Sequence, residues 1–132
     1  MSDDFEGILT PIFADSIGWL VSFCHQRSVD AGWYTDAKTG QPMQRNVGEM
    51  LALIHSEISE ALEGYRKKLM DDHLPDRCMI EVELADAMIR IADLAGYLNL
   101  DIGGAIDEKL AYNLKRSDHK PEARVGKNGK QF

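Results

Sequence analysis

Residues 77–98 read RCMIEVELADAMIRIADLAGYL, and this segment decides the fold. Its apolar side chains recur at three- and four-residue intervals and cover most of a helix circumference, which predicts a central helix buried on nearly all sides. These side chains are Met79, Ile80, Val82, Leu84, Met88, Ile89, Ile91, Leu94 and Leu98. A polar stripe of Glu83, Asp86, Arg90 and Asp93 runs along the same helix, at a spacing that core residues usually occupy. Buried ionisable groups need partners, so the stripe indicates either a structural salt-bridge network through Arg90 or a functional site.

The rest of the chain is also helical in its periodicity, and no segment shows the alternation of a β-strand. We predict further helices over residues 10–29, 46–69 and 101–116, separated by a long loop at 30–46 and a connector at 71–76. Thr10 and Pro11 have the pattern of a cap followed by a first helical residue. Asn46 and Glu49 have the spacing of a capping box, and Asp101 is the expected cap of the last helix. The predicted fold class is therefore all-α.

Charge is distributed unevenly along the 132 residues. The chain carries −7 in total, but the part from residue 109 onward is basic and carries +5, so the first 108 residues carry −12. An acidic body of this kind argues against nucleic acid as a partner. We therefore predict one domain over residues 1–116 and a basic C-terminal tail over 117–132 that closes over a substrate.

Compartment and membrane contact follow from the apolar runs and the cysteines. No apolar run reaches the roughly 20 residues that a membrane span needs, and the acidic N-terminus does not resemble a signal peptide. Cys24 and Cys78 have neither a metal-binding spacing nor the pattern of a disulfide framework, so two reduced, mostly buried thiols are expected. The prediction is a cytoplasmic protein with no membrane partner.

Two short acidic motifs indicate the chemistry, Glu57-x-x-Glu60 and Glu83-x-x-Asp86. Carboxylates three residues apart project from the same side of a helix, so two facing pairs would place four of them around one point. Such a group needs a cation, and Mg²⁺ is the first candidate because it prefers oxygen ligands and shares them with phosphates. For Glu57 and Glu60 taken alone, the solvated edge of an amphipathic helix is the alternative.

A basic stripe on the helix over 101–116 suits a polyphosphate ligand. Lys109, Asn113 and Arg116 fall on one side of that helix, and the guanidinium group offers a bidentate fork to phosphate oxygens. Alone it would be a solvated basic face, whereas opposite a carboxylate cluster it becomes a substrate clamp. Trp33, in the long loop, is expected either to stack on a base or to pack on the helices.

These motifs resemble a known family. The stretch from Asn46 to Glu63, NVGEMLALIHSEISEALE, looks like the first metal-binding helix of MazG-like all-α nucleoside triphosphate pyrophosphohydrolases, and Glu81–Asp86, EVELAD, looks like the second. The segment from Lys109 to Arg116 and the ending GKQF are similar to small single-domain members.

The resemblance implies a function and a site. Glu57, Glu60, Glu83 and Asp86 would bind Mg²⁺, with Mn²⁺ as a substitute, and would be the catalytic residues, with Glu60 as the candidate base or outer ligand. Lys109, Asn113 and Arg116 would contact the nucleotide. The reaction would convert a (deoxy)nucleoside triphosphate to its monophosphate and pyrophosphate, in a four-helix-bundle-like MazG-type fold that forms a tight dimer or a dimer of dimers. Base and sugar preference stay open.

Two other classes remain as alternatives. A non-catalytic helical dimerisation or adaptor module would use the charged stripe to set register. A ferritin-like di-iron carboxylate protein would need Glu-x-x-His pairs, and none of the four histidines has a glutamate three residues before it.

Overall fold

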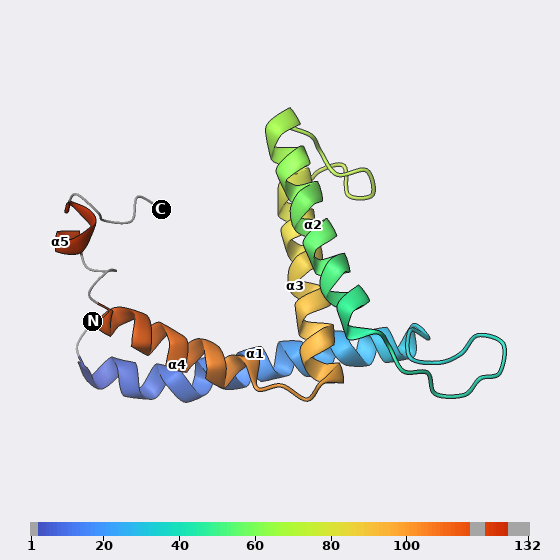
Figure 1. Ribbon diagram of the computed structural model, residues 1–132, viewed down its shortest axis with the longest axis horizontal. Helices are drawn as coiled ribbons and strands as arrows, with labels where there is room; N and C mark the ends of the chain where they lie inside the picture. The colour runs from blue at the N-terminus through green and yellow to red at the C-terminus, as the bar shows by residue number, and fades with distance from the viewer. Residues whose placement is uncertain (1–2, 117–120, 127–132) are drawn as a thin grey trace. The chain divides into compact units, whose positions relative to one another are not determined.

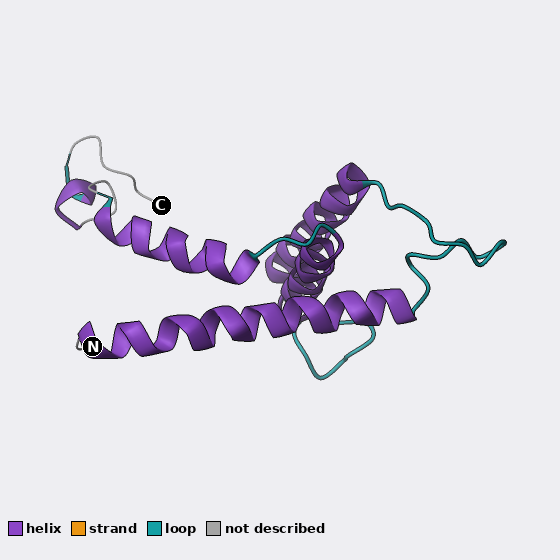
Figure 2. Cartoon of the chain, turned by 90° about the horizontal axis from the view of Figure 1, so that it is seen from below, coloured by secondary structure: helices purple, strands orange, loops and turns teal. Residues whose placement is uncertain are grey.

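The computed structural model describes residues 3–116 and 121–126, and the described chain is helical without a β-strand (Figures 1 and 2). The helices are α1 (Asp3–Asp30), α2 (Val47–Lys67), α3 (Met79–Tyr97), α4 (Ile102–Lys115) and the short α5 (Pro121–Arg124). Extended pairing within the described residues is limited to two isolated bridges, Thr35 with Pro42 and Met70 with Cys78. The all-α prediction is confirmed. Within the predicted tail, residues 117–120 and 127–132 lie outside the described residues.

The chain divides into two compact units. One contains the described residues up to Gly18 and those from Asp101 onward, and the other runs from Trp19 to Leu100. In the first unit, α4 approaches α1 closely at Gly103, where an added Cβ would lie 2.6 Å from the carbonyl oxygen of Ala14. Asp101 caps α4, because its carboxylate accepts a hydrogen bond from the amide of Gly104 at 3.0 Å.

In the second unit, α2 and α3 form an antiparallel pair that lies side by side (Figure 1). Asn46 caps α2 as predicted, since its side-chain oxygen accepts a hydrogen bond from the amide of Glu49 at 3.0 Å. The connector is held by Asp71, which is buried and accepts the amides of His73 and Leu74. The two helices approach each other closely at Gly64 on α2, because a Cβ on this residue would meet Met79 at under 3 Å.

The first predicted helix begins earlier than expected. We predicted a start at Thr10 and Pro11, whereas α1 begins at Asp3 and Pro11 lies inside it. Proline in a helix interior removes one backbone hydrogen bond, so it destabilises the helix but does not always end it.

The prediction that α3 is buried on nearly all sides is wrong for the single chain. Leu84, Met88, Ile89 and Ile91 are between 41% and 57% exposed. The helix instead packs through small side chains: Ala87, Ala92 and Ala95 are buried. Small residues allow close approach, and a close helix pair leaves the larger apolar side chains outside the contact.

The other boundary and compartment predictions have mixed outcomes. The helix predicted over 77–98 runs from Met79 to Tyr97, and the segment predicted as a long loop is not helical beyond Asp30. Cys24 is buried as expected, but Cys78 is exposed because it precedes α3 in the connector. None of the described helices combines the length and the hydropathy that crossing a bilayer requires.

Candidate metal centre and adjoining cavity

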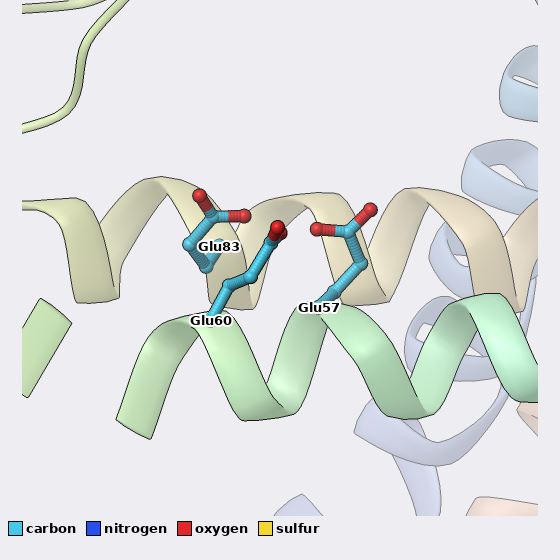
Figure 3. A group of neighbouring side chains, drawn as sticks. All are labelled: Glu57, Glu60 and Glu83. Carbon is cyan, nitrogen blue, oxygen red and sulfur yellow. The ribbon is translucent and has the colours of Figure 1, made fainter. Parts of the chain in front are cut away.

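Three glutamates converge between α2 and α3 (Figure 3). Glu57 and Glu60 stand one helical turn apart on α2 and point toward Glu83 on α3. One carboxylate oxygen from each residue lies within 4.8 Å of the other two. The convergence follows from the sequence, since the three-residue spacing aligns the first two side chains and the tight α2–α3 contact brings the third to them.

The three glutamates differ in exposure, and this difference excludes a solvated helix edge as the surroundings of Glu57. Glu57 is only 7% exposed, Glu83 is partly exposed and Glu60 is exposed. Glu57 is therefore not part of a solvated helix edge. Its Oε1 accepts a charge-assisted hydrogen bond from Nε of Arg90 at 2.6 Å, so the ion pair that a structural network through Arg90 requires is present.

This single pairing leaves most of the negative charge in the cluster uncompensated. Among the described residues, Arg90 is the one cation that forms a salt bridge to the three glutamates. Burial and the neighbouring carboxylates Glu57, Glu60 and Asp86 raise the pKa of Glu83 from 4.5 to about 7. A raised pKa means that a proton substitutes for a missing cation near neutral pH.

The pKa values of the other two glutamates, Glu57 and Glu60, shift in opposite directions. Burial alone would raise the pKa of Glu57, but hydrogen bonds with Arg90, Glu83 and Glu60 outweigh it and hold the pKa below its ordinary value. The hydrogen bond with Glu57 raises the pKa of Glu60, and partial burial adds to the effect. Of the three glutamates, Glu57 is therefore the one whose surroundings favour the charged form.

The spacing of the oxygens is compatible with a divalent cation. Oxygens on opposite sides of one Mg²⁺ lie about 4.2 Å apart, twice the metal–oxygen distance, and Mg²⁺ usually keeps several water ligands. A separation of up to 4.8 Å thus needs only small side-chain rotations. The donor set consists of carboxylates alone, which suits a hard cation, and Glu57, Glu60 and Glu83 are the residues that would hold it.

Asp86, the fourth predicted ligand, does not belong to this group of oxygens. It lies one turn after Glu83 on α3 and lines a neighbouring cavity together with Glu57. Burial, and then the charge of Glu57, raise the pKa of Asp86. The residue is near the cluster, and its role as a ligand stays a prediction.

The cavity beside the cluster has a volume of about 460 Å³. From α2 and α3 it takes Met50, Leu53 and Ile89 as apolar walls, and Glu57, Asp86 and Arg90 as polar ones. The remaining lining residues are Ser28, Trp33, Arg45, Glu49 and Asp93. A cavity that combines apolar walls with a few converging polar groups is the usual form of a small-molecule site.

A second polar cluster holds Asp93 in place. Its Oδ1 accepts a hydrogen bond from Nδ1 of His25 on α1 at 2.9 Å and another from the hydroxyl of Tyr34 at 2.8 Å. The Tyr34 ring also contacts the rings of His25 and Tyr97. Burial, and then the hydrogen bond to Asp93, raise the pKa of Tyr34. Tyr34 therefore packs on the helices.

Arg45 closes this part of the cavity. Its guanidinium carbon lies 5.8 Å from the centroids of both the Trp33 and the Tyr34 rings, and Nη1 donates to the carbonyl of Trp33 at 3.3 Å. Sequence reasoning missed Arg45 and His25, because each lies far along the chain from the α3 stripe and neither forms part of a motif. Trp33 was identified, and the structure places its 61% exposed side chain at the cavity with Glu57 and Asp86.

The predicted phosphate-binding stripe belongs to the first unit, whereas the carboxylates belong to the second. On α4, the amine of Lys109 lies 4.7 Å from the ring centroid of Tyr112. Oδ1 of Asn113 is buried and accepts no hydrogen bond from the described residues. Arg116 forms the C-terminal cap of α4. That these residues face the carboxylates stays a prediction.

Comparison of the chain with protein-family models, with curated proteins and with solved structures finds no match. The similarity to MazG-like pyrophosphohydrolases therefore rests on the sequence motifs alone.

Proposed function

We propose that this chain is a Mg²⁺-dependent, MazG-like nucleoside triphosphate pyrophosphohydrolase with a four-helix-bundle-like fold. Its reaction is the hydrolysis of a (deoxy)nucleoside triphosphate to the monophosphate and pyrophosphate. The observation that supports the proposal most is the convergence of Glu57, Glu60 and Glu83 next to a cavity large enough for a nucleoside. A carboxylate cluster that lacks counter-charge favours a divalent cation, and a polyphosphate is the ligand that divalent cations commonly bridge to protein.

Each part of the proposed site has a defined task. A divalent cation bound by the carboxylates supplies neutralisation of phosphate charge and makes a nearby water more acidic. Glu60, the exposed member of the cluster, is the candidate base for that water. Arg90 holds Glu57 in its buried position. Lys109, Asn113 and Arg116 are proposed to bind phosphate oxygens, and Trp33 to stack on the base.

The direct test is a panel of the common NTPs and dNTPs with Mg²⁺ or Mn²⁺, scored for release of pyrophosphate and monophosphate. We expect turnover that a chelator abolishes. Glu57→Gln and Glu83→Gln should lower kcat at least about a hundredfold, a typical loss when a group that stabilises transition-state charge is removed. Glu63→Gln is the matched control, because this glutamate lies on α2, three residues after Glu60, and pairs with Lys67.

Asp86→Asn is the sharpest single variant. The resemblance makes Asp86 a metal ligand, whereas its oxygens lie outside the three-glutamate group. Loss of turnover with an unchanged thermal melt would support the assignment. A wild-type rate for Asp86→Asn in Mg²⁺ would remove Asp86 from the site, and a protein that hydrolyses none of the triphosphates would overturn the proposed function.

We also propose that a second copy of the chain covers the outer faces of α2 and α3. Large apolar side chains on these faces are between 41% and 68% exposed. They are Leu51, Ile58, Leu62, Tyr65, Leu84, Met88 and Ile91. Their three-, four- and seven-residue spacing makes one stripe on each helix, which is the pattern of a helix–helix interface. Light scattering coupled to size exclusion should give the mass of a dimer or a tetramer, and a monomer at micromolar concentration would contradict this proposal.

The ion pair between Arg90 and Glu57 favours a second candidate function, a non-catalytic helical interaction module with a structural charged seam. Such a module would gain no stability from ligands. Thermal melts with and without Mg²⁺ plus a non-hydrolysable triphosphate separate the two functions, because a ligand at a hundred times its Kd stabilises the folded state by about 2.7 kcal/mol.

A further inference from the structure

The cavity contains a carboxylate that the proposed metal chemistry does not use. Asp93 lies two helical turns after Asp86 on α3, about 10 Å farther along the helix axis, and both line the same cavity. That separation suits the distance between the phosphate next to the sugar and the base of one nucleotide. If phosphates bind at the glutamates, the base therefore falls at Asp93.

Asp93 is fixed in orientation by its neighbours. Both of its hydrogen bonds, from His25 and Tyr34, go to Oδ1. The packing of His25 leaves little freedom, because Gly96 on α3 stands directly against it and any Cβ there would clash with the His25 side chain. Among the described residues no hydrogen bond to Oδ2 is found, so this oxygen is the acceptor that Asp93 offers to a ligand.

Two of the guanidinium donors in this part of the cavity are engaged within the chain, and the Ser28 hydroxyl also lines it. Arg45 donates to the carbonyl of Trp33 and lies over the Trp33 ring, and Arg90 donates to Glu57. Glu49, the other ionisable group on this wall, is a carboxylate and accepts hydrogen bonds like Asp93. The wall that would face the base therefore includes two carboxylates, Glu49 and Asp93, as acceptors.

We propose, on the basis of the proposed nucleotide hydrolysis, that Asp93 reads the base: Oδ2 accepts a hydrogen bond from an exocyclic amino group, so the site selects amino-bearing nucleobases over their counterparts without that group. Guanine, adenine and cytosine offer this donor, whereas hypoxanthine and uracil present carbonyl oxygens or a bare carbon at the same positions. A carbonyl oxygen opposite a fixed carboxylate is repelled, and a buried polar group left without its partner is costly.

The test uses matched nucleotide pairs that differ at the amino group: GTP with ITP, ATP with ITP, and CTP with UTP. We measure kcat/KM for each and the Kd of the corresponding monophosphates by calorimetry with Mg²⁺. For at least one pair we expect the amino-bearing member to be favoured about tenfold or more, the size of one hydrogen bond to a charged group. Equal values within all three pairs would overturn the inference.

Asp93→Asn gives a directional result. The amide oxygen can still accept from His25 and Tyr34, so the amide nitrogen takes the place of Oδ2 and offers a donor to the cavity. We expect the preference to reverse toward ITP or UTP, with kcat changing less than KM. Tyr34→Phe removes one of the two orienting hydrogen bonds and should weaken the preference without reversing it.

Two controls separate the possible failures. Asp72→Asn removes one carboxylate from the exposed connector and should leave every ratio unchanged. Glu49→Gln tests the neighbouring acceptor, and loss of discrimination in this variant but not in Asp93→Asn would refute the assignment to Asp93. Absence of both hydrolysis and binding for all of these nucleotides would refute the proposed function. Hydrolysis with equal kcat/KM within each pair would refute only the proposed recognition of the base by Asp93.

Discussion

Replacing Glu83 with glutamine should stabilise the metal-free protein at pH 8 and change it little at pH 5. Glu83 has a pKa of about 7 in the folded chain against an ordinary value of 4.5, because it is partly buried among other carboxylates. Between these two values the folded chain binds more protons at this position than the unfolded chain does. The contribution to stability is therefore fully present below pH 4.5 and is lost as the pH rises through about 7.

The size of the effect follows from the shift. A rise from 4.5 to about 7 corresponds to at most about 3–4 kcal/mol. Partial exposure of Glu83 and proton sharing within the cluster reduce this to about 1–2 kcal/mol. Glu57 acts in the opposite direction, because its lowered pKa contributes stability above 4.5 that is lost as the pH falls. The test must therefore compare the free energies of unfolding of wild type and Glu83→Gln at the same pH, because the pH dependence of wild type alone combines both effects.

Urea unfolding in a chelating buffer measures the difference. Wild type, Glu83→Gln and the control Glu63→Gln are compared at pH 5 and pH 8, and then with saturating Mg²⁺ at pH 8. At pH 8 without metal, we expect the free energy of unfolding of Glu83→Gln to exceed that of wild type by about 1–2 kcal/mol. Addition of Mg²⁺ should stabilise this variant less than it stabilises wild type. Parallel stability curves for wild type and Glu83→Gln across this pH range would refute the argument that uncompensated charge at Glu83 prepares the cluster for a cation.

Three further variants test separate features of the second unit. Arg90→Gln leaves the buried Glu57 without its cation, so we expect a loss of about 1–3 kcal/mol, and a tighter Mg²⁺ affinity would show that Arg90 competes with the metal. Gly64→Ala places a Cβ against the Cβ and Cγ of Met79, which forces α2 and α3 apart and should cost about 1–3 kcal/mol in urea unfolding. Trp33→Ala should raise KM about tenfold to a hundredfold by removing a stacking surface, while Trp33→Phe retains most of the affinity.

Local spacing explains why part of the site could be predicted from sequence. Glu57 and Glu60 fall on one side of a helix whatever surrounds them, and the cap at Asn46 needs only the three residues that follow it. The extent of α1 could not be predicted in the same way, because Pro11 is a local signal against a helix and the backbone overrides it. Burial of α3 could not be predicted either, because exposure depends on which of its faces meets α2.

Contacts between distant residues explain what sequence reasoning missed at Asp93. The sequence pattern groups Asp93 with Arg90 in one charged stripe on α3. Its partners are instead His25, 68 positions away, and Tyr34, 59 positions away. Neither spacing follows any period of a helix or strand, so no pattern along the chain could have indicated the cluster.

The stripe on α3 thus has two parts with different surroundings. Glu83 and Asp86 lie among carboxylates and form no salt bridge among the described residues, and Arg90 is paired with Glu57. Asp93 is held by His25 and Tyr34 and keeps one oxygen for the cavity. A purely structural network would neutralise all four groups, and here the salt bridges among the described residues leave Glu83 and Asp86 without a partner cation. From Glu83 to Asp93 the stripe spans about 15 Å, enough for a cation, a phosphate and a base in succession. A ligand that brings positive charge to one end and an amino group to the other would satisfy both ends at once, which neither a cation alone nor a nucleoside alone can do.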